Sequence, residues 1–423
     1  MVYQFLKIVF RISQFFYFKK VEIIGTNNIP VNEANLIIAN HPSSFQDPIL
    51  IGLDFKKPIH FLTAEEFMGK GLTYKFIENH IKAIPIYRAT TRPDEVHKNT
   101  DSFSKCYEAL AQHKNILIFP EGFSDTQTWL SEIKTGTARI AIDTLKQNPN
   151  LTKLNIIPVG LNYSNPHQFR SSFLLNIGEI IQLNQSHTHD KYTLTKLCYT
   201  NLRKSINGLD INEVDWQEAL LVIIKSNQDN LQLKQNFNSD SKFITKLDNL
   251  NHSDQIVFEK LKSKSIALKD SLEQLNITLK NYINYINPPK QNNLKQLLFS
   301  VLFIPGYIMN GLPLILVEKI VNNKEMKYSF KGGLFFALGT FISLIWHLII
   351  VIVFSYYIGW ASLIVPFILL LFGYITLKCR DFLKPINDYK KLKKYYSTLN
   401  KNELDKVQKS FFELEIEIKT TFN

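Results

Sequence analysis

Short apolar runs alternate with longer stretches of helical periodicity between residues 21 and 207. Seven of the apolar runs are candidate strands: Val21–Ile24, Leu36–Ala39, Ile59–Leu62, Ala83–Tyr87, Asn115–Phe119, Asn155–Leu161 and Leu174–Ile177. Three candidate helices are Ile49–Leu53, Asp101–His113 and Ala138–Lys146. Strands that alternate with helices predict a layered α/β domain in which helices cover a central sheet.

The first 18 residues predict an amphipathic helix. Gln4, Lys7, Arg11 and Gln14 recur at steps of three and four and form one polar stripe, while most other positions are apolar. Charge interrupts the stretch too often for a transmembrane helix or the core of a signal peptide. We therefore expect a helix that lies in the membrane interface, with a terminal helix packed on the core as the alternative.

Residues 213–287 predict soluble helices. Apolar residues recur at alternating steps of four and three from Leu268 to Ile286, as in a heptad seam. A helical hairpin with its turn near Asn236–Asp240 is expected, and Pro288 and Pro289 end it. We interpret this stretch as a structural spacer without chemistry.

Apolar segments dominate the chain after residue 296. The stretches 333–354 and 362–377, the second together with the residues just before it, are each about long enough to span a bilayer and predict a transmembrane hairpin. The stretch 297–317 has lysines on both sides and contains Pro305 and Pro313. These features favour a broken, re-entrant segment over a simple span.

The charge distribution indicates on which side of a membrane these segments end. The chain carries a formal net charge of +12, and residues 378–394 contribute seven basic side chains against two aspartates. Basic residues next to an apolar segment mark the cytoplasmic side. We therefore expect a protein of the inner or cytoplasmic membrane with its catalytic domain on the cytoplasmic face. No nucleic-acid partner is expected, because no recognition motif accompanies the charge.

One candidate for chemistry is the stretch from Asn40 to Pro48. An apolar run ends at His41, a turn containing Pro42 follows, and Asp47 comes six positions after the histidine. A carboxylate placed there can hydrogen-bond one imidazole nitrogen and leave the other to act as a base. The alternative is an aspartate that caps the following helix beside a packed histidine.

Three further stretches combine an apolar run with functional side chains. Phe119 and Pro120 lead into Glu121 and Gly122, where a carboxylate can bind substrate hydroxyls and a glycine lets the backbone approach closely. Arg88 follows the run 84–87, and its planar guanidinium suits a phosphate. The third stretch is the proline-interrupted run 156–163. Taken singly, each is equally a strand-end turn, a surface ion pair or a bent strand.

In this order, the four stretches resemble the conserved blocks of the glycerolipid acyltransferase family over about residues 20–207. The family's NHxxxxD block corresponds to Asn40, His41 and Asp47, and its FPEG block is present in full at 119–122. Arg88 and the run 157–159 correspond to the other two blocks. The chain resembles most closely the fungal-type glycerol-3-phosphate/dihydroxyacetone-phosphate acyltransferases.

The resemblance implies a layered α/β domain with a central mixed sheet and an O-acyltransferase activity. It implies that an acyl group moves from acyl-CoA or acyl-acyl carrier protein to glycerol 3-phosphate or 1-acylglycerol 3-phosphate in phospholipid synthesis. His41 would act as the general base and Asp47 as its partner. The implied substrate-binding residues are Arg88, Glu121, Gly122, Ser124 and Lys134. Another lysophospholipid as acceptor, or a catalytically idle membrane scaffold of the same fold, are the alternatives.

One departure concerns the residues after the FPEG block. Many bacterial relatives continue with Thr-Arg-Ser, whereas this chain has Phe123, Ser124 and Asp125. Lys134 or Arg139 would have to supply the missing cation.

No bound cofactor or metal is expected. The three cysteines have no CxxC spacing, and the histidines at 187 and 189 fall in a polar loop. The sequence also lacks the GxSxG pattern of a covalent serine enzyme, so direct transfer is expected.

The domain organisation follows from these patterns. We predict an interfacial helix at 1–20, the acyltransferase domain at 21–207, and a coiled-coil-like helical region at 208–290. A membrane region at 291–380, with the re-entrant segment and the hairpin, and a basic cytoplasmic helical tail at 381–423 follow.

Overall fold

The computed structural model describes residues 2–186, 190–210, 212–226, 233–322 and 325–422. His187 and His189, which the sequence places in a solvated loop, lie outside the described residues. Two compact units make up the chain. The first contains Met1–Gly208 and Val317–Phe341, and the second contains Leu209–Leu316 and Ile342–Asn423.

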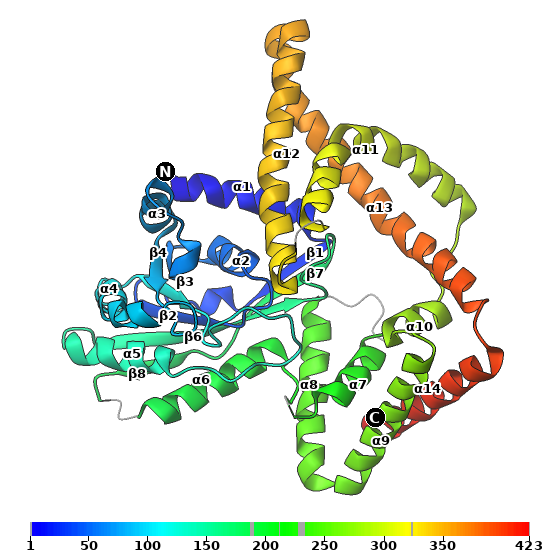
Figure 1. Ribbon diagram of the computed structural model, residues 1–423, viewed down its shortest axis with the longest axis horizontal. Helices are drawn as coiled ribbons and strands as arrows, with labels where there is room; N and C mark the ends of the chain where they lie inside the picture. Colours follow the sequence, from blue (N-terminus) through cyan, green and yellow to red (C-terminus); the bar gives the residue numbers. More distant parts are fainter. Residues whose placement is uncertain (1, 187–189, 211, 227–232, 323–324, 423) are drawn as a thin grey trace. The chain divides into compact units, whose positions relative to one another are not determined.

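The first unit is built on one mixed sheet (Figure 1). Its strands are β1 (Lys20–Ile24), β2 (Ala34–Ala39), β3 (Ile59–Ala64), β4 (Ala83–Ile86), β5 (Asn115–Ile118), β6 (Lys153–Tyr163), β7 (Ser172–Ile177) and β8 (Ile181–Asn184). The strand order is β1-β7-β6-β2-β5-β3-β4, and β8 pairs with β6. Only the β6–β7 and β6–β8 pairings are antiparallel. The mixed α/β sheet expected from the sequence is thus confirmed.

Helices cover both faces of this sheet. They are α1 (Val2–Tyr17), α2 (Gln46–Asp54), α3 (Leu72–Phe76), α4 (Asn99–Ala111), α5 (Gly136–Gln147) and α6 (Lys191–Ile206). Leu36 and Ile38 of β2 pack in one core cluster with residues of α4, α5 and α6, whereas Ile37 and Ala39 pack in the other with residues of α1 and α2. In Figure 1, α1 lies above the central strands β2 and β6, and α6 lies below them. A central strand covered on both faces explains why β2 is apolar without alternation.

The strand directions determine where a site can form. Strand β2 runs parallel to β5 and β6, and β3 runs parallel to β4 and β5. All five strands therefore point the same way, and their carboxyl ends meet at one edge of the sheet. The loops that follow these strands are the usual ligand-binding position in an open α/β sheet. All of the sequence blocks that carry candidate chemistry end at this edge.

A distant segment also belongs to the first unit. Val317–Phe341 contains the start of α12 (Tyr328–Ile358), and its Phe336 is 1% exposed within the same cluster as Ile37 and Tyr17. The sequence prediction treats 291–380 as a single membrane region. An apolar helix that packs on protein and one that faces lipid share the same composition, so hydrophobicity alone does not separate them.

The second unit contains a helical cluster that differs from the expected hairpin. Its helices α7 (Val214–Ser226), α8 (Leu233–Ser253), α9 (Gln255–Gln274), α10 (Leu279–Ile286) and α14 (Lys401–Phe422) share one buried core. The turn expected near Asn236–Asp240 is wrong, because these residues lie inside α8. The chain turns instead at Asp254, whose carboxylate accepts a hydrogen bond from the Val257 N–H at the start of α9. The polar surface of a helix resembles a turn in composition, which explains the wrong prediction. The N-cap hydrogen bond of Asp254 marks where α8 ends and α9 begins.

The heptad seam from Leu268 to Ile286 is also interrupted. Helix α9 ends at Gln274, and Asn276 has a φ of 53°, which continues no right-handed helix. The hydroxyl of Thr278 then caps α10 by accepting from the Asn281 N–H. The seam residues are therefore divided between two helices of one core.

The apolar helices follow the predicted segments with shifted ends. Helix α11 (Asn293–Asn322) is uninterrupted and contains both Pro305 and Pro313, so the expected break is wrong. A proline removes one backbone hydrogen bond and can kink a helix without ending it. Helices α12 and α13 (Val365–Tyr396) are joined by a 3-10 turn at Gly359–Ile364.

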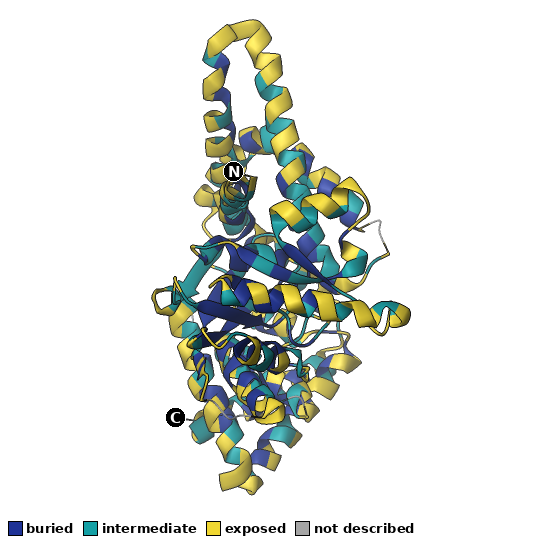
Figure 2. Ribbon diagram, turned by 90° about the vertical axis from the view of Figure 1, so that its left-hand side faces the viewer, coloured by how far each residue is buried: buried dark blue, intermediate teal, exposed yellow. Residues whose placement is uncertain are grey.

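In the part of the chain that the structure describes, two stretches are long and apolar enough to cross a membrane, Asn293–Asn322 and Tyr328–Tyr396. Figure 2 shows the end of the α12–α13 hairpin as almost entirely exposed, in contrast to the buried strands.

Candidate functional site

His41 and Asp47 lie in contact at the carboxyl end of β2. The imidazole Nδ1 of His41 is 2.8 Å from Oδ2 of Asp47, and the two side chains are 17% and 0% exposed. Because a carboxylate accepts, Nδ1 donates, and Nε2 carries the lone pair. The described residues give Nε2 no hydrogen-bond partner. The ring is thus held at one nitrogen and reaches solvent.

The spacing of these two residues differs from the NHxxxxD block. Five residues separate His41 from Asp47 in this chain, so the expected HxxxxD spacing is wrong by one. The backbone absorbs the additional residue at Ser44, which has a φ of 44°. Two tight turns follow, since the Gln46 N–H bonds to the Ser43 carbonyl and the Asp47 N–H to the Ser44 carbonyl. The loop thereby returns Asp47 to the imidazole.

Three donors converge on the Asp47 carboxylate. Its Oδ2 accepts from His41 Nδ1 and from the Ser43 N–H, the latter at 2.8 Å. Its Oδ1 accepts from the Tyr163 hydroxyl at 2.7 Å. Burial and the nearby Asp47 charge raise the pKa of Tyr163 well above its usual value, so this hydroxyl remains a donor. A fully buried carboxylate needs such partners to be stable.

Glu121 and Phe119 fix the histidine from the adjacent strand. The His41 ring stacks on Phe119 with centroids 3.7 Å apart and planes 10° from parallel. Glu121 Oε1 accepts from the His41 N–H at 3.2 Å, and Oε2 accepts from the Ser131 N–H at 3.1 Å. Burial raises the pKa of Glu121, while these backbone N–H groups oppose the rise. In this arrangement the carboxylate holds the histidine backbone.

Gly122 and Lys134 lie together beside this carboxylate. Gly122 has a φ of 79°, and a Cβ built there would lie 2.7 Å from Nζ of Lys134. The Lys134 N–H bonds to the Pro120 carbonyl at 2.9 Å, which ties the lysine to the same loop. Within the described chain, no carboxylate lies within 4 Å of the Lys134 ammonium. Arg139, the other candidate cation, lies over the Phe103 ring and 3.6 Å from Asp143.

Ser124 connects two loops. Its hydroxyl accepts a hydrogen bond from the Ser44 N–H at 3.0 Å. Its carbonyl accepts from Lys327 Nζ at 2.7 Å and from the Ser329 hydroxyl at 3.1 Å. Both polar groups of Ser124 are therefore occupied by the protein.

Arg88 lies apart from these residues along the same edge. It follows β4, which is three positions from β2 in the sheet, or about 14 Å at the usual strand spacing. Its Nη1 lies 3.5 Å from Oε1 of Glu66. The structure thus brings together His41, Asp47, Glu121, Gly122, Ser124 and Lys134, and it leaves Arg88 at a distance.

Several residues of the site had no role assigned to them from the sequence, although Asn40 and Tyr163 stand in the blocks it singled out. Tyr163 stands in the fourth sequence block, where its position at the end of an apolar strand was a usable signal. Asn40 forms a double hydrogen bond with the backbone of Leu161, donating to its carbonyl at 3.1 Å and accepting from its N–H at 2.8 Å. Lys327 and Ser329 gave no signal, because they are about 200 positions away in the chain.

The family comparison agrees with the position of this site. Residues 20–162 match the family model described as acyltransferase. This range contains β1 through most of β6, and hence His41, Asp47, Glu121 and Lys134.

Curated relatives are yeast acyltransferases. The chain is 24% identical over 280 residues to glycerol-3-phosphate O-acyltransferase 2 of Saccharomyces cerevisiae, a match that covers 60% of this chain and 36% of the relative. It is 36% identical over 81 residues to glycerol-3-phosphate O-acyltransferase 1 of the same yeast, covering 19% and 10%. An uncharacterized acyltransferase of Schizosaccharomyces pombe is 38% identical over 81 residues, covering 19% and 12%. The chain thus spans about a third of the first relative and less of the others.

A solved structure is also similar. It is the crystal structure of the 1-acyl-sn-glycerophosphate acyltransferase from Thermotoga maritima, with a TM-score of 0.36 and 19% sequence identity. The match covers 47% of this chain and 78% of that one.

Proposed function

We propose, from the acyltransferase-family domain at residues 20–162 and its likeness to the yeast glycerol-3-phosphate O-acyltransferases, that this chain is a glycerolipid O-acyltransferase. It transfers a fatty acyl group from an acyl thioester to a hydroxyl of glycerol 3-phosphate or 1-acylglycerol 3-phosphate. The observation that carries the proposal is the His41–Asp47 contact within the matched domain.

The proposed reaction uses the free nitrogen of His41. Nε2 removes the proton of the acceptor hydroxyl as its oxygen attacks the thioester carbonyl carbon. The carbon–sulfur bond then breaks, and the thiolate leaves with the proton from the imidazolium, which gives an ester and a free thiol. Asp47 stabilises the charge that the ring carries in between. Asp47 and Phe119 together fix the plane of the His41 ring, so the base is oriented before substrate binds.

The test is acyl transfer in membranes that contain the full chain. Labelled acyl-CoA and acyl-acyl carrier protein are each offered with glycerol 3-phosphate, 1-acylglycerol 3-phosphate and a lysophospholipid that has a choline headgroup. We expect a labelled ester with at least one of the two phosphate monoesters. Absence of transfer to all three acceptors from both donors contradicts the proposal, and transfer to the choline lipid alone corrects the acceptor class.

Lys134 is the cation that we assign to the acceptor phosphate. The Lys134→Gln variant is expected to raise the KM for glycerol 3-phosphate about 10-fold or more, because a hydrogen bond to a charged group contributes about 1.5–3 kcal/mol. The KM for the thioester should change little. Steady-state kinetics with each substrate varied in turn measure both values.

Arg139→Gln is the matched control for this prediction. Arg139 lies on α5 and is engaged with Phe103 and Asp143, so its loss should leave the KM for the acceptor unchanged. An acceptor KM that rises equally in both variants, or in neither, removes Lys134 from this role.

Helix α1 supports the membrane side of the proposal. Its polar stripe faces the protein: Lys7 Nζ bonds to the Phe55 carbonyl at 2.6 Å, and Arg11 lies 2.6 Å from Asp54. Its apolar stripe points outward, and its large residues are exposed. They are Phe5 (63%), Ile8 (62%), Ile12 (47%) and Phe15 (60%). Such an outward apolar stripe suits the interior of a bilayer leaflet.

Replacing Phe5, Ile8 and Phe15 by serine is expected to weaken membrane attachment without unfolding the domain. About 1.5–3 kcal/mol is at stake for each large side chain that enters the bilayer. The measurement is liposome flotation of the first unit, residues 1–208 joined by a flexible linker to residues 317–341, as wild type and as triple variant, after circular dichroism has shown that both fold. Equal flotation of the two contradicts the assignment of this face to lipid.

A further inference from the structure

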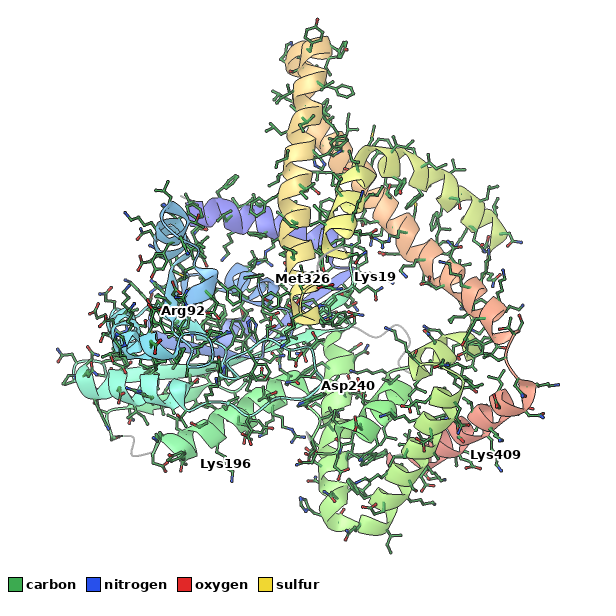
Figure 3. The ribbon with its side chains drawn as sticks, in the orientation of Figure 1. Lys19, Arg92, Lys196, Asp240, Met326 and Lys409 are labelled. Carbon is green, nitrogen blue, oxygen red and sulfur yellow. The ribbon has the colours of Figure 1, made fainter. Side chains whose placement is uncertain are left out.

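The start of α12 packs on the loop that carries His41 and Asp47. The segment concerned is residues 327–333, which comprises Lys327 and the first residues of α12 and follows Met326, labelled in Figure 3. Ser329, Gly332 and Gly333 are buried there against the first unit. Gly332 and Gly333 approach the segment between the histidine and the aspartate, and Ser329 bonds to the Ser124 carbonyl beside it.

Two glycines make the approach possible. A Cβ at Gly332 would lie 2.3 Å from the Pro166 carbonyl oxygen and 2.8 Å from Oγ of Ser43. A Cβ at Gly333 would lie 3.0 Å from the Ser43 carbonyl oxygen and 3.1 Å from the Gln46 backbone nitrogen. At Gly333 the helix therefore lies against the backbone of the catalytic loop. A side chain at 332 would meet the Pro166 carbonyl and the Ser43 hydroxyl, so the helix would have to move away from this loop.

Polar and aromatic contacts support the same arrangement. Lys327 and Ser329 hold the Ser124 carbonyl, and the Ser124 hydroxyl accepts from the Ser44 N–H. The ring of Phe330 lies 5.5 Å from that of Phe45, centroid to centroid. Ser43, Ser44, Phe45 and Gln46 are thus each reached by this segment, directly or through Ser124.

The conformation of Ser44 explains why such support is needed. A serine at a φ of 44° lies in the left-handed region that non-glycine residues disfavour. Such a conformation persists where surrounding contacts hold it. If the loop relaxes, Asp47 moves away from Nδ1 of His41.

We propose that Lys327 and the first residues of α12, up to Gly333, are positioning residues of the active site, which hold the loop 43–46 so that Asp47 contacts His41. The inference rests on the proposed acyltransferase function. The segment 327–333, far along the chain from His41, thus contributes to catalysis without touching substrate. It acts by holding the loop 43–46 in place.

The test compares three glycines of one helix in the full-length enzyme. Gly332→Ala is expected to lower kcat about 10²-fold, as a displacement of about 1 Å at a catalytic group does. Gly333→Ala should lower kcat less, because a Cβ there lies 3.0 Å from the Ser43 carbonyl oxygen, whereas a Cβ at 332 clashes with the Pro166 carbonyl oxygen at 2.3 Å and Ser43 Oγ at 2.8 Å and pushes the whole helix start away. Gly339→Ala is the control, since a Cβ there meets nothing within 4 Å. The KM values for donor and acceptor should stay the same in all three.

The kcat and KM values separate positioning from simple loss of structure. They are measured on protein that retains the wild-type thermal unfolding midpoint in detergent. Lys327→Met and Lys327→Arg form a second pair that introduces no clash: the first should lower kcat and the second restore it, because arginine also donates to the Ser124 carbonyl. This pair decides the matter if Gly332→Ala does not fold.

The outcomes distinguish this inference from the proposed function. A wild-type enzyme that transfers acyl groups, with Gly332→Ala and Lys327→Met as fast as Gly339→Ala, overturns the positioning role and leaves the function intact. A fall in kcat at 332 and 327, with unchanged KM, supports it. A wild-type chain that transfers no acyl group overturns both.

Discussion

Replacing His41 with alanine is expected to lower kcat by about 10²–10⁴-fold, the usual contribution of a positioned general base. Among the described residues Nε2 has no hydrogen-bond partner, whereas Nδ1 is engaged by Asp47 and the ring is stacked on Phe119. No other described histidine has this combination of a buried acid and a partly exposed ring. The KM for the acceptor should change little, because we assign the acceptor phosphate to Lys134.

The measurement is acyl transfer per folded enzyme in detergent micelles or liposomes. His97→Ala is the matched control, because this histidine is exposed on the surface of the same unit. Loss of the His41 side chain leaves its backbone N–H bond to Glu121 in place, so the fold should persist. Full activity of His41→Ala rules out a general base at this position.

The sheet was largely predictable from the sequence. All seven expected strands are present, because each is a compact apolar run bounded by polar or turn residues. The eighth, Ile181–Asn184, was missed: it has only four residues, and its buried and exposed positions alternate, which is a weak signal at this length.

The site was predictable where its residues are close in the chain. His41 and Asp47 were paired because a loop of a few residues brings a carboxylate back to an imidazole. Glu121 was identified as a functional residue, but its hydrogen bonds to the backbone N–H groups of His41 and Ser131 are not revealed by any sequence pattern. Arg88 was assigned to phosphate from its residue type, and the strand order, which only the structure supplies, separates it from His41.

The contribution of α12 was beyond sequence reasoning for a different reason. The contact between Lys327 and Ser124 joins residues 203 positions apart. A glycine pair in an apolar helix indicates close packing, but the pattern does not say against which partner. A helix in lipid and a helix packed on a sheet have the same composition, so only the three-dimensional structure distinguishes them.

Replacing Asp47 is expected to have the second-largest effect, and its size should depend on the substitute. Asp47→Ala removes an acceptor from three donors, and each buried donor left unpaired costs about 1–3 kcal/mol. It also frees the imidazole to take either tautomer. We therefore expect a loss in kcat of about 10³–10⁴-fold, near that of His41→Ala, together with a lower thermal midpoint.

Asp47→Asn should lower kcat less than Asp47→Ala, for a reason specific to this loop. The Ser43 N–H and the His41 Nδ1–H both point at the Oδ2 position, so the amide oxygen is stabilised there and the amide NH₂ is disfavoured. The NH₂ group then occupies the Oδ1 position, where the Tyr163 hydroxyl can accept from it. His41 keeps an acceptor and its tautomer, and only the negative charge is lost.

We expect Asp47→Asn to lower kcat by about 10²-fold, the share due to charge stabilisation of the imidazolium. Tyr163→Phe is the control, since it removes one donor to Asp47 and leaves the carboxylate charged, and its kcat should fall much less. If Asp47→Asn is as slow as Asp47→Ala, the amide has turned and the tautomer is lost, so the Ser43 N–H does not fix the oxygen. If Asp47→Asn is as fast as wild type, the negative charge has no part in catalysis, and Asp47 acts only as an orienting acceptor.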